Sequence, residues 1–320
     1  MGRVVKIGTI SRVLHLQSIP RQDYIALCEE MVEKAGKAGC DLVLLPEHFD
    51  SFGACELEGT QQNLYREGTD YSSIRRQIAE PIPGPLTQSL GKLAARYHMY
   101  VVANYTELDG SKLYNTAVII DRQGRVAGKY RKTHLCANEK RCFGICAGDE
   151  LPVFHLDFGV VGIAICMDIY FPEVFRVLTL KGAEMILWPH QTYGPSEETL
   201  QIMARSKAID YNCVLVTSNF ASPDYYAPYS PGHAMTGRAM IINHEGLIIA
   251  ETGHYPGIAM AEIDLDIPKI GKDVAMARRA GIDYLREDIL RFRRPELYGE
   301  IVAPVDNRAV LEGRFLDESD

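Results

Sequence analysis

The sequence predicts an α/β fold built from packed layers of strands and helices. Short apolar runs rich in Val, Ile and Leu alternate along the chain with longer segments of helical periodicity, and most connections between them are short. Three predicted strands are followed almost at once by an ionisable side chain, namely Glu47, Lys132 and Cys166. Because ligands collect at strand ends in layered α/β folds, we expect these three side chains to share one site.

The first half of the chain contains five predicted strands and two predicted helices. The helix over residues 23–37 is predicted from one apolar face that includes Cys28, Val32 and Ala35. The hairpin turn at 121–124 joins the last two strands, and the polar, Gly-containing stretch 49–82 predicts an irregular lid or pocket wall. The strands are residues 4–10, 42–45, 100–106, 113–120 and 126–130, and the second helix is 86–97.

The second half repeats the alternation and then changes character. Pro172 followed by Glu173 is typical of the first turn of a helix, here 172–181. The other predicted helix is 197–211, and the predicted strands are 160–165, 185–188, 214–218, 239–242, 247–251 and 258–263. We therefore expect a catalytic domain over residues 1–264, with side chains of the site drawn from both halves.

The last segment, residues 265–320, is expected to form an arm. It is charged and helical in pattern, and Ile282, Leu285, Ile289 and Phe292 recur at helical spacing. This apolar stripe requires burial, so we expect the arm to pack on the core or on a second subunit.

Cys166 ends a buried strand directly before a predicted helix. A thiol at such a corner lies near the positive end of the helix, which favours the nucleophilic thiolate. A cysteine at a strand end is, taken alone, more often a small buried hydrophobic residue. The presence of Glu47 and Lys132 in the same position on other strands is what indicates catalysis.

A carboxylate, an ammonium and a thiol suffice for cleavage of an amide. The thiolate of Cys166 would attack the carbonyl and form a thioester, which divides the reaction into two easier steps. The carboxyl of Glu47 would take the thiol proton and give one to the leaving amine. The ammonium of Lys132 would stabilise the oxyanion in a site poor in water.

The chain resembles the nitrilase, or carbon–nitrogen hydrolase, superfamily, whose catalytic residues are Glu, Lys and Cys in that order. The matching motifs are Leu-Leu-Pro-Glu47, Tyr-Arg-Lys132-Thr-His-Leu and Cys166-Met-Asp-Ile-Tyr-Phe-Pro-Glu, and weaker matches extend to Arg293-Arg-Pro-Glu-Leu-Tyr298. The resemblance implies a four-layer αββα sandwich, catalysis without a cofactor, and homodimers or larger even assemblies. It also implies a second active-site glutamate between the Lys and the Cys, a role that falls to Glu139.

The resemblance also bears on the substrate. The triplet Cys166-Met167-Asp168 resembles the branch that acts on amides and N-carbamoyl compounds, which would release ammonia, whereas the nitrile branch tends to carry Cys-Trp-Glu. The backbone N–H of Met167 is expected to complete the oxyanion hole, and four further candidates for the substrate pocket are Asp168, Tyr170, His190 and Tyr193. For each of these side chains the alternative is a local structural role. Nitrile hydrolysis and a catalytically silent interaction protein are the rival functions.

Composition excludes several other classes of protein. The formal charge of −8 gives no basic surface for nucleic acid or anionic lipid, and no apolar stretch approaches the roughly 18 residues of a membrane span. The chain begins with a predicted strand in place of a signal-peptide pattern. Its eight cysteines are too sparse for a disulfide scaffold, which indicates a reducing compartment. We therefore expect a cytoplasmic protein. His134, Cys136, Cys142 and Cys146 match no paired zinc-ligand spacing, so we expect no metal.

Overall fold

The computed structural model describes residues 2–13, 20–51, 70–191, 197–221, 237–266, 290 and 292–303. The chain divides into two compact units, Met1–Ile270 and Gly271–Asp320. The first unit contains all of the predicted strands. In the second, the described elements are a 3-10 turn, η5 (Pro295–Leu297), and a short helix, α9 (Gly299–Val302).

The first sheet is centred on β1, which pairs in parallel with β2 and antiparallel with β13. Beyond β2 the order continues through β3 and β4 to β5, with β6 paired beside β4. The strands of this sheet are β1 (Val4–Val13), β2 (Leu42–Leu44), β3 (Tyr100–Asp109), β4 (Lys112–Ile120), β5 (Val126–Arg131), β6 (Ile145–Cys146) and β13 (Gly257–Asp264).

The second sheet has β8, β9 and β10 in parallel, with antiparallel strands at its edges. The end of β1 pairs with the end of β10 over Ser11–Val13, which joins the two sheets. Its strands are β7 (Val153–Leu156), β8 (Gly159–Ile163), β9 (Met185–Pro189), β10 (Val214–Ala221), β11 (Met240–Ile242) and β12 (Ile248–Glu251).

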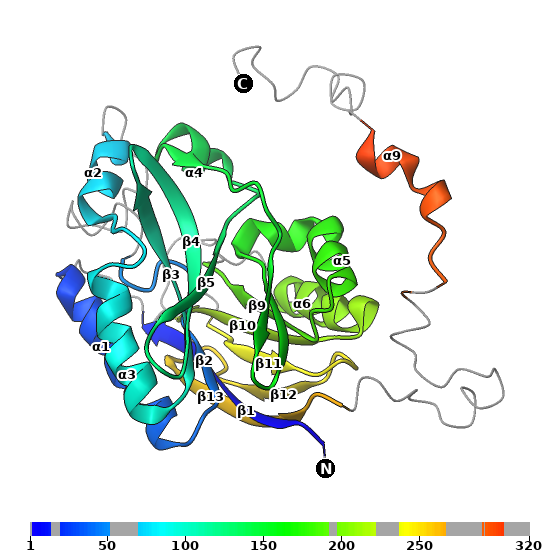
Figure 1. Cartoon of the computed structure of the whole chain (residues 1–320), viewed down its shortest axis with the longest axis horizontal. Helices are drawn as coiled ribbons and strands as arrows, with labels where there is room; N and C mark the ends of the chain where they lie inside the picture. Colours follow the sequence, from blue (N-terminus) through cyan, green and yellow to red (C-terminus); the bar gives the residue numbers. More distant parts are fainter. Residues whose placement is uncertain are drawn as a thin grey trace. The chain divides into compact units, whose positions relative to one another are not determined.

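The two sheets lie face to face between two layers of helices, so the predicted four-layer αββα sandwich is confirmed (Figure 1). One apolar cluster lies between the sheets and contains Ile7, Leu44 and Ile163. A second cluster packs the first sheet against α1 (Arg21–Lys37) and α3 (Pro85–Tyr97). A third packs the second sheet against α5 (Pro172–Leu180) and α6 (Glu197–Tyr211).

The helices form where their apolar residues make a continuous stripe. In α1 the buried side chains include Tyr24, Cys28, Val32 and Ala35, at the spacing that places them on one face. Asp23 in the first turn and Lys34 and Lys37 in the last turn complement the helix dipole. The apolar face of α1 therefore packs against the first sheet, and the charged side chains of the helix lie on its opposite face.

Four short elements were not predicted from the sequence. The helix α2 (Tyr71–Ile78) lies inside the stretch predicted to be irregular, and it begins where Asp70 accepts a hydrogen bond from the backbone N–H of Ser73. The helix α4 (Ala137–Arg141) and the strands β6 and β7 were also missed, because each spans less than two turns or a few residues. Of the predicted apolar stripe on the arm, only Phe292 lies among the described residues.

No helix in the described part of the chain is both long enough and apolar enough to cross a lipid bilayer.

Candidate active site

Cys166 stands on a short turn between β8 and α5. The 3-10 turn η3 (Cys166–Tyr170) begins at the cysteine itself and separates it from α5, which begins at Pro172. Its φ of 43° is in the left-handed region, which costs a residue with a side chain about 1 kcal/mol or more. The indole Nε1 of Trp188 donates to the Cys166 carbonyl at 3.0 Å. The surrounding structure thus holds the nucleophile in one defined orientation.

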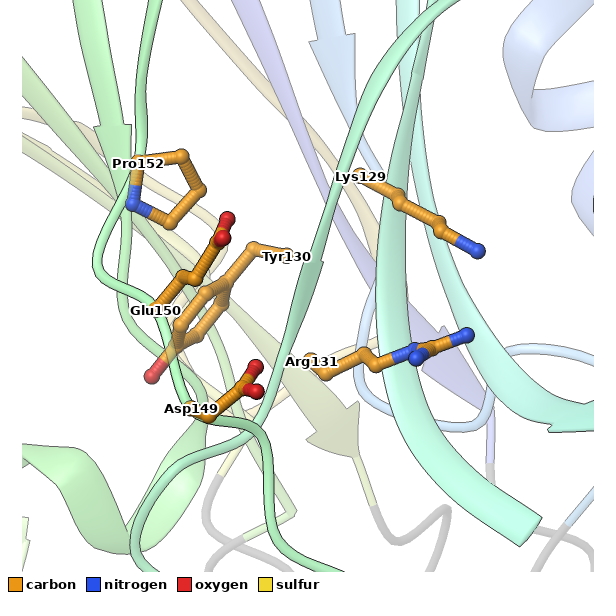
Figure 2. A pocket seen from close by; sticks show the side chains of 6 residues that line it. All are labelled: Lys129, Tyr130, Arg131, Asp149, Glu150 and Pro152. Carbon is orange, nitrogen blue, oxygen red and sulfur yellow. The ribbon is translucent and has the colours of Figure 1, made fainter. Parts of the chain in front are cut away.

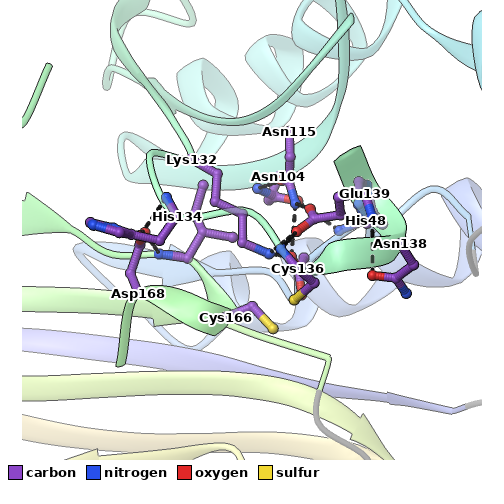
Figure 3. Close-up of polar contacts among 12 residues, drawn as sticks. His48, Asn104, Asn115, Lys132, His134, Cys136, Asn138, Glu139, Cys166 and Asp168 are labelled. Atoms are coloured by element: carbon purple, nitrogen blue, oxygen red, sulfur yellow. Dashed lines mark hydrogen bonds and ion pairs between the residues drawn. The ribbon is translucent and has the colours of Figure 1, made fainter. Parts of the chain in front are cut away.

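Asp168 connects the turn that carries Cys166 to the strand end that carries Lys132 (Figure 3). Its fully buried carboxylate accepts hydrogen bonds from the backbone N–H of Ile165 at 2.8 Å and from the Tyr130 hydroxyl at 2.7 Å. Its other oxygen lies 2.9 Å from Nδ1 of His134. Because Tyr130 and His134 flank Lys132, this carboxylate fixes the two catalytic segments relative to each other.

Lys132 lies between two carboxylates at the centre of the site. Its Nζ donates to Oε1 of Glu47 at 3.1 Å and to Oε2 of Glu139 at 2.7 Å, and all three side chains are buried. Asn115 Nδ2 donates to Oε1 of both carboxylates, at 2.8 Å to Glu47 and 2.7 Å to Glu139. The structure therefore brings together Glu47, Lys132 and Glu139, as predicted from the sequence.

Two of these side chains follow the ends of strands, and the third lies on a short helix. Glu47 follows β2, and Lys132 follows β5, where its backbone N–H donates to the Asn115 carbonyl at 2.9 Å. Glu139 lies on α4, and its carboxylate also accepts from the backbone N–H of Cys136 at 2.8 Å. The short helix that the sequence did not predict is thus the element that places the fourth charged group.

Sequence reasoning missed two asparagines of the site. Asn104 Nδ2 donates to Oδ1 of Asn115 at 2.8 Å, and Asn104 Oδ1 accepts from the backbone N–H of His48 at 2.7 Å. Both asparagines are fully buried within apolar strands. A buried polar side chain needs a hydrogen-bond partner. An asparagine within an apolar predicted strand was therefore the feature of the sequence that could have indicated these two residues.

The two carboxyl groups have different pKa values. Burial raises the pKa of Glu47, and this effect exceeds the opposing effect of the Lys132 charge. Burial would also raise the pKa of Glu139, but the charge of Lys132 and its hydrogen bond hold that pKa below the ordinary value. Burial would lower the pKa of Lys132, yet Glu47, Cys166 and Glu139 together raise it well above its ordinary value. Within this pair Glu47 therefore keeps a proton to higher pH than Glu139 does.

Cys166 is a protonated thiol in the resting site. Cys136 lies against it, and the hydrogen bond between the two thiols, followed by burial and the charge of Glu47, raises the pKa of Cys166 well above its ordinary value. The same contact lowers the pKa of Cys136. This direction is opposite to the predicted shift toward the thiolate, because a carboxylate and a second thiol face the sulfur in place of the start of α5. A base is needed to generate the nucleophile.

The remaining predicted pocket residues lie in different surroundings. Met167 is partly exposed beside the nucleophile, whereas the Tyr170 side chain is 61% exposed. His190 is fully buried after β9, stacked 3.9 Å from the Trp188 ring, and burial lowers its pKa to about 3, so its imidazole is neutral. Tyr193 lies outside the described residues. The carboxylate of Asp168 is occupied by the partners named above.

Among the described residues, Glu47, His48 and Glu139 are the one group of potential metal ligands whose atoms all lie within 4.8 Å of one another. The Lys132 ammonium already bridges the two carboxylates of this group, so a cation would have to displace it. The cysteine loop that offers soft ligands, with His134, Cys136, Cys142 and Cys146, does not converge on a common point in the described structure.

A separate pocket of about 230 Å³ lies beside β5 (Figure 2). It is lined by Lys129, Tyr130, Arg131, Asp149, Glu150 and Pro152. Both of its cations are paired with Glu107, and Arg131 also contacts Asp109 at 2.6 Å. Because both of its cations are already paired with Glu107, this pocket offers no unpaired cation to a ligand.

Comparisons with known proteins found a matching family model, related sequences and similar folds. The family model described as carbon-nitrogen hydrolase matches residues 16–267. A deaminated glutathione amidase from Bos taurus is 27% identical over 313 residues, covering 92% of this chain and 84% of the relative. A nitrilase from Pyrococcus abyssi is 32% identical over 284 residues, covering 87% of this chain and 94% of the relative. The solved structure of an amidase from Nesterenkonia sp. AN1 superposes with a TM-score of 0.71 at 20% identity, covering 94% of this chain and 98% of that one.

Proposed function

The chain belongs to the carbon–nitrogen hydrolase family, and on that premise we propose that it hydrolyses a small amide or N-carbamoyl compound through a thioester on Cys166. The observation that carries the proposal is the Lys132 ammonium, which bridges Glu47 and Glu139 beside the cysteine. A cation, a proton-exchanging carboxyl and a thiol are the groups that this chemistry needs.

In the first half of the reaction, the Cys166 thiol gives its proton to the Glu47 carboxylate as the sulfur attacks the substrate carbonyl. The resulting oxyanion is stabilised by the Lys132 ammonium and by the backbone N–H of Met167. The N–H groups of Cys166 and Met167 precede the first backbone hydrogen bond of the turn, from Asp168 N to Ile165 O, so they are available. Collapse of the intermediate breaks the C–N bond, and the leaving amine takes the proton from Glu47.

In the second half, water attacks the thioester. Glu47 accepts one proton of that water, the acid product leaves, and the proton returns to the Cys166 sulfur. Glu139 stays ionised throughout, because it keeps Lys132 charged and holds it in place. No step of this sequence requires a metal or a cofactor.

The amide assignment is supported by the Cys166-Met167-Asp168 triplet and by the amidases among the relatives. The relative from Pyrococcus abyssi bears the name nitrilase, so nitrile hydrolysis is the second candidate. In that reaction the thiol would add to the nitrile carbon, and the same Lys132 and Glu47 would serve the intermediate that follows.

We also propose that the protein acts in the cytoplasm as a homodimer or larger even assembly. Phe292 and Val302 support assembly, because their side chains are 68% and 84% exposed and would gain from burial against a partner. The acidic net charge of −8 gives no reason to expect nucleic acid or membrane among its partners.

A panel of small amides, N-carbamoyl amino acids, N-carbamoyl amines and nitriles, with ammonia detection, tests the proposed reaction. We expect ammonia from at least one amide or N-carbamoyl compound at neutral pH without added metal. Ammonia from nitriles alone would favour the second candidate. No turnover on the whole panel, by a folded protein with a reactive Cys166, would contradict both.

A further inference from the structure

Arg75 is a buried cation that has no matching anion among the described residues. The residue lies on α2 and is 2% exposed, and its guanidinium Nη1 makes one long hydrogen bond, 3.3 Å to Oγ1 of Thr106. Its Nε has no hydrogen-bond partner, and no carboxylate of the described residues forms an ion pair with it. The guanidinium carbon lies 4.8 Å from the centre of the Phe143 ring.

Burying a charge in this way is costly. The attraction between a cation and an aromatic ring is weaker than the hydration that the cation loses on burial. The other buried cation of this region, Lys132, is matched by Glu47 and Glu139. The planar fork of a guanidinium is suited to binding a carboxylate through two parallel hydrogen bonds. The Nε of Arg75 has no hydrogen-bond partner among the described residues, so the side of the guanidinium that carries Nε can bind a carboxylate.

The position of Arg75 relates it to the catalytic centre. Thr106, its hydrogen-bond partner on β3, is paired directly with Asn115 on β4. Side chains of such a pair are about 5 Å apart at Cβ, and both face the interior between the sheets. Asn115 in turn donates to both Glu47 and Glu139. The guanidinium therefore lies one step along the sheet from the reacting groups.

His48 lies close to both cations. His48 directly follows Glu47 in the sequence, and its side chain is 4% exposed. Burial is the largest cause that lowers the pKa of His48 well below its ordinary value, and the charges of Arg75 and Lys132 lower it further. The imidazole is therefore neutral, and its Nδ1 has no hydrogen-bond partner among the described residues. A second polar group between the two cations is thus available to a ligand.

We propose that Arg75 binds a carboxylate of the substrate, so that the preferred substrates are amides or N-carbamoyl compounds that also carry an ionised carboxylate. This assignment rests on the proposed function and specifies its substrate class. Lys132 and Met167 hold the end of the substrate that reacts, and Arg75 holds the acidic end.

The test compares hydrolysis of an anionic amide, succinamate, with that of its neutral methyl ester, followed by ammonia release. Wild type is expected to hydrolyse succinamate with a kcat/KM at least about 10-fold above that of the ester, as hydrogen bonds to charged groups allow. In Arg75→Gln this ratio should fall by about 10-fold or more, mainly through KM for succinamate. The matched control is Arg76→Gln, an exposed arginine on the same helix that contacts only the Ser111 carbonyl in the described structure, and its ratio should equal that of wild type.

Arg75→Lys keeps the positive charge but lacks the two parallel donors of the guanidinium, so it should retain part of the preference for succinamate. This variant keeps the proposal testable if Arg75→Gln fails to fold. A wild-type protein without preference for succinamate, or an Arg75→Gln protein that keeps it, would overturn the proposal. If wild type hydrolyses neither compound, the proposed function is judged by the wider panel of substrates, and the role of Arg75 is judged separately by protection of Cys166 from iodoacetamide. Succinate should then protect wild type more than the neutral succinamide does, and equal protection would refute the role of Arg75.

Discussion

The hydroxyl of Tyr130 donates a hydrogen bond of 2.7 Å to the buried carboxylate of Asp168, and this contact joins the two halves of the catalytic site. Tyr130 belongs to the strand that ends at Lys132, and Asp168 belongs to the turn that begins at Cys166. Lys132 follows a strand of the first sheet and Cys166 follows a strand of the second, so their separation depends on such a connection. Asp168 therefore acts through Lys132 and Cys166 and need not touch the substrate.

Asp168→Asn should damage catalysis by loosening this connection. An amide in place of the carboxylate presents an N–H₂ group to at least one of the donors at Ile165, Tyr130 and His134. We expect kcat to fall by about 10-fold or more with a smaller change in KM, and the free energy of unfolding to fall by about 2 kcal/mol. Steady-state kinetics and urea unfolding measure the two effects. The exposed Asp149→Asn is the matched control, and an Asp168→Asn protein with wild-type kcat would contradict the positioning role.

Lys132→Met should reduce kcat by about 100-fold or more, because the variant loses a donor to the oxyanion. It also leaves Glu47 and Glu139 facing each other without the ammonium, so the pair should retain a shared proton at higher pH than in wild type. Kinetics on the best substrate of the panel check the first effect, with the exposed Lys140→Met as control. A change confined to KM would show instead that Lys132 is a substrate-binding charge.

The reactivity of Cys166 should depend on Cys136. The hydrogen bond between the thiols of Cys166 and Cys136 is the largest cause of the raised pKa of Cys166, so Cys136→Ala should lower that pKa. Since the thiolate is the form that reacts, the inflection in the rate of alkylation by iodoacetamide should move to lower pH. Mass spectrometry of the peptide that contains Cys166 measures the rate, with Cys142→Ala as control. An inflection at unchanged or higher pH would show that the contact between the two thiols does not set the pKa.

Three side chains of the candidate site were predictable because each leaves a local signal. Glu47, Lys132 and Cys166 each follow an apolar strand, and the strand pattern could be read from the sequence. The layered fold followed from the same alternation and from the resemblance of the motifs. Glu139 was found through the resemblance alone, since nothing in its neighbourhood predicted the short helix that carries it.

The features that were missed depend on contacts distant in the chain. The raised pKa of Cys166 arises from Cys136 and Glu47, which lie on other elements, so the local pattern of strand and helix gave the opposite direction. Asn115 acts as a bridge only because β2, β4 and α4 meet around its side chain. The unmatched charge of Arg75 is visible only once the residues around it are known.

Assembly should depend on the exposed apolar residues of the arm. Full-length protein is expected to be a homodimer or larger even assembly, and the double variant Phe292→Ser/Val302→Ser should dissociate more readily. A chain that ends after Asp266 keeps the 2.8 Å contact between Arg3 and Asp266 and should lose subunits. Light scattering after size-exclusion chromatography measures both. A monomeric full-length protein, or truncation without effect, would show that the arm makes no such interface.

The central claim is that Cys166 is the nucleophile of an amide-cleaving reaction, and its most direct test is ammonia release by Cys166→Ala. Wild type and variant are compared at equal concentration on the best amide or N-carbamoyl substrate, after circular dichroism has shown that both are folded. We predict that the variant loses at least about a thousandfold in rate, because it lacks the thiol that the proposed mechanism uses as the nucleophile. A folded Cys166→Ala protein that releases ammonia within tenfold of the wild-type rate would contradict the mechanism.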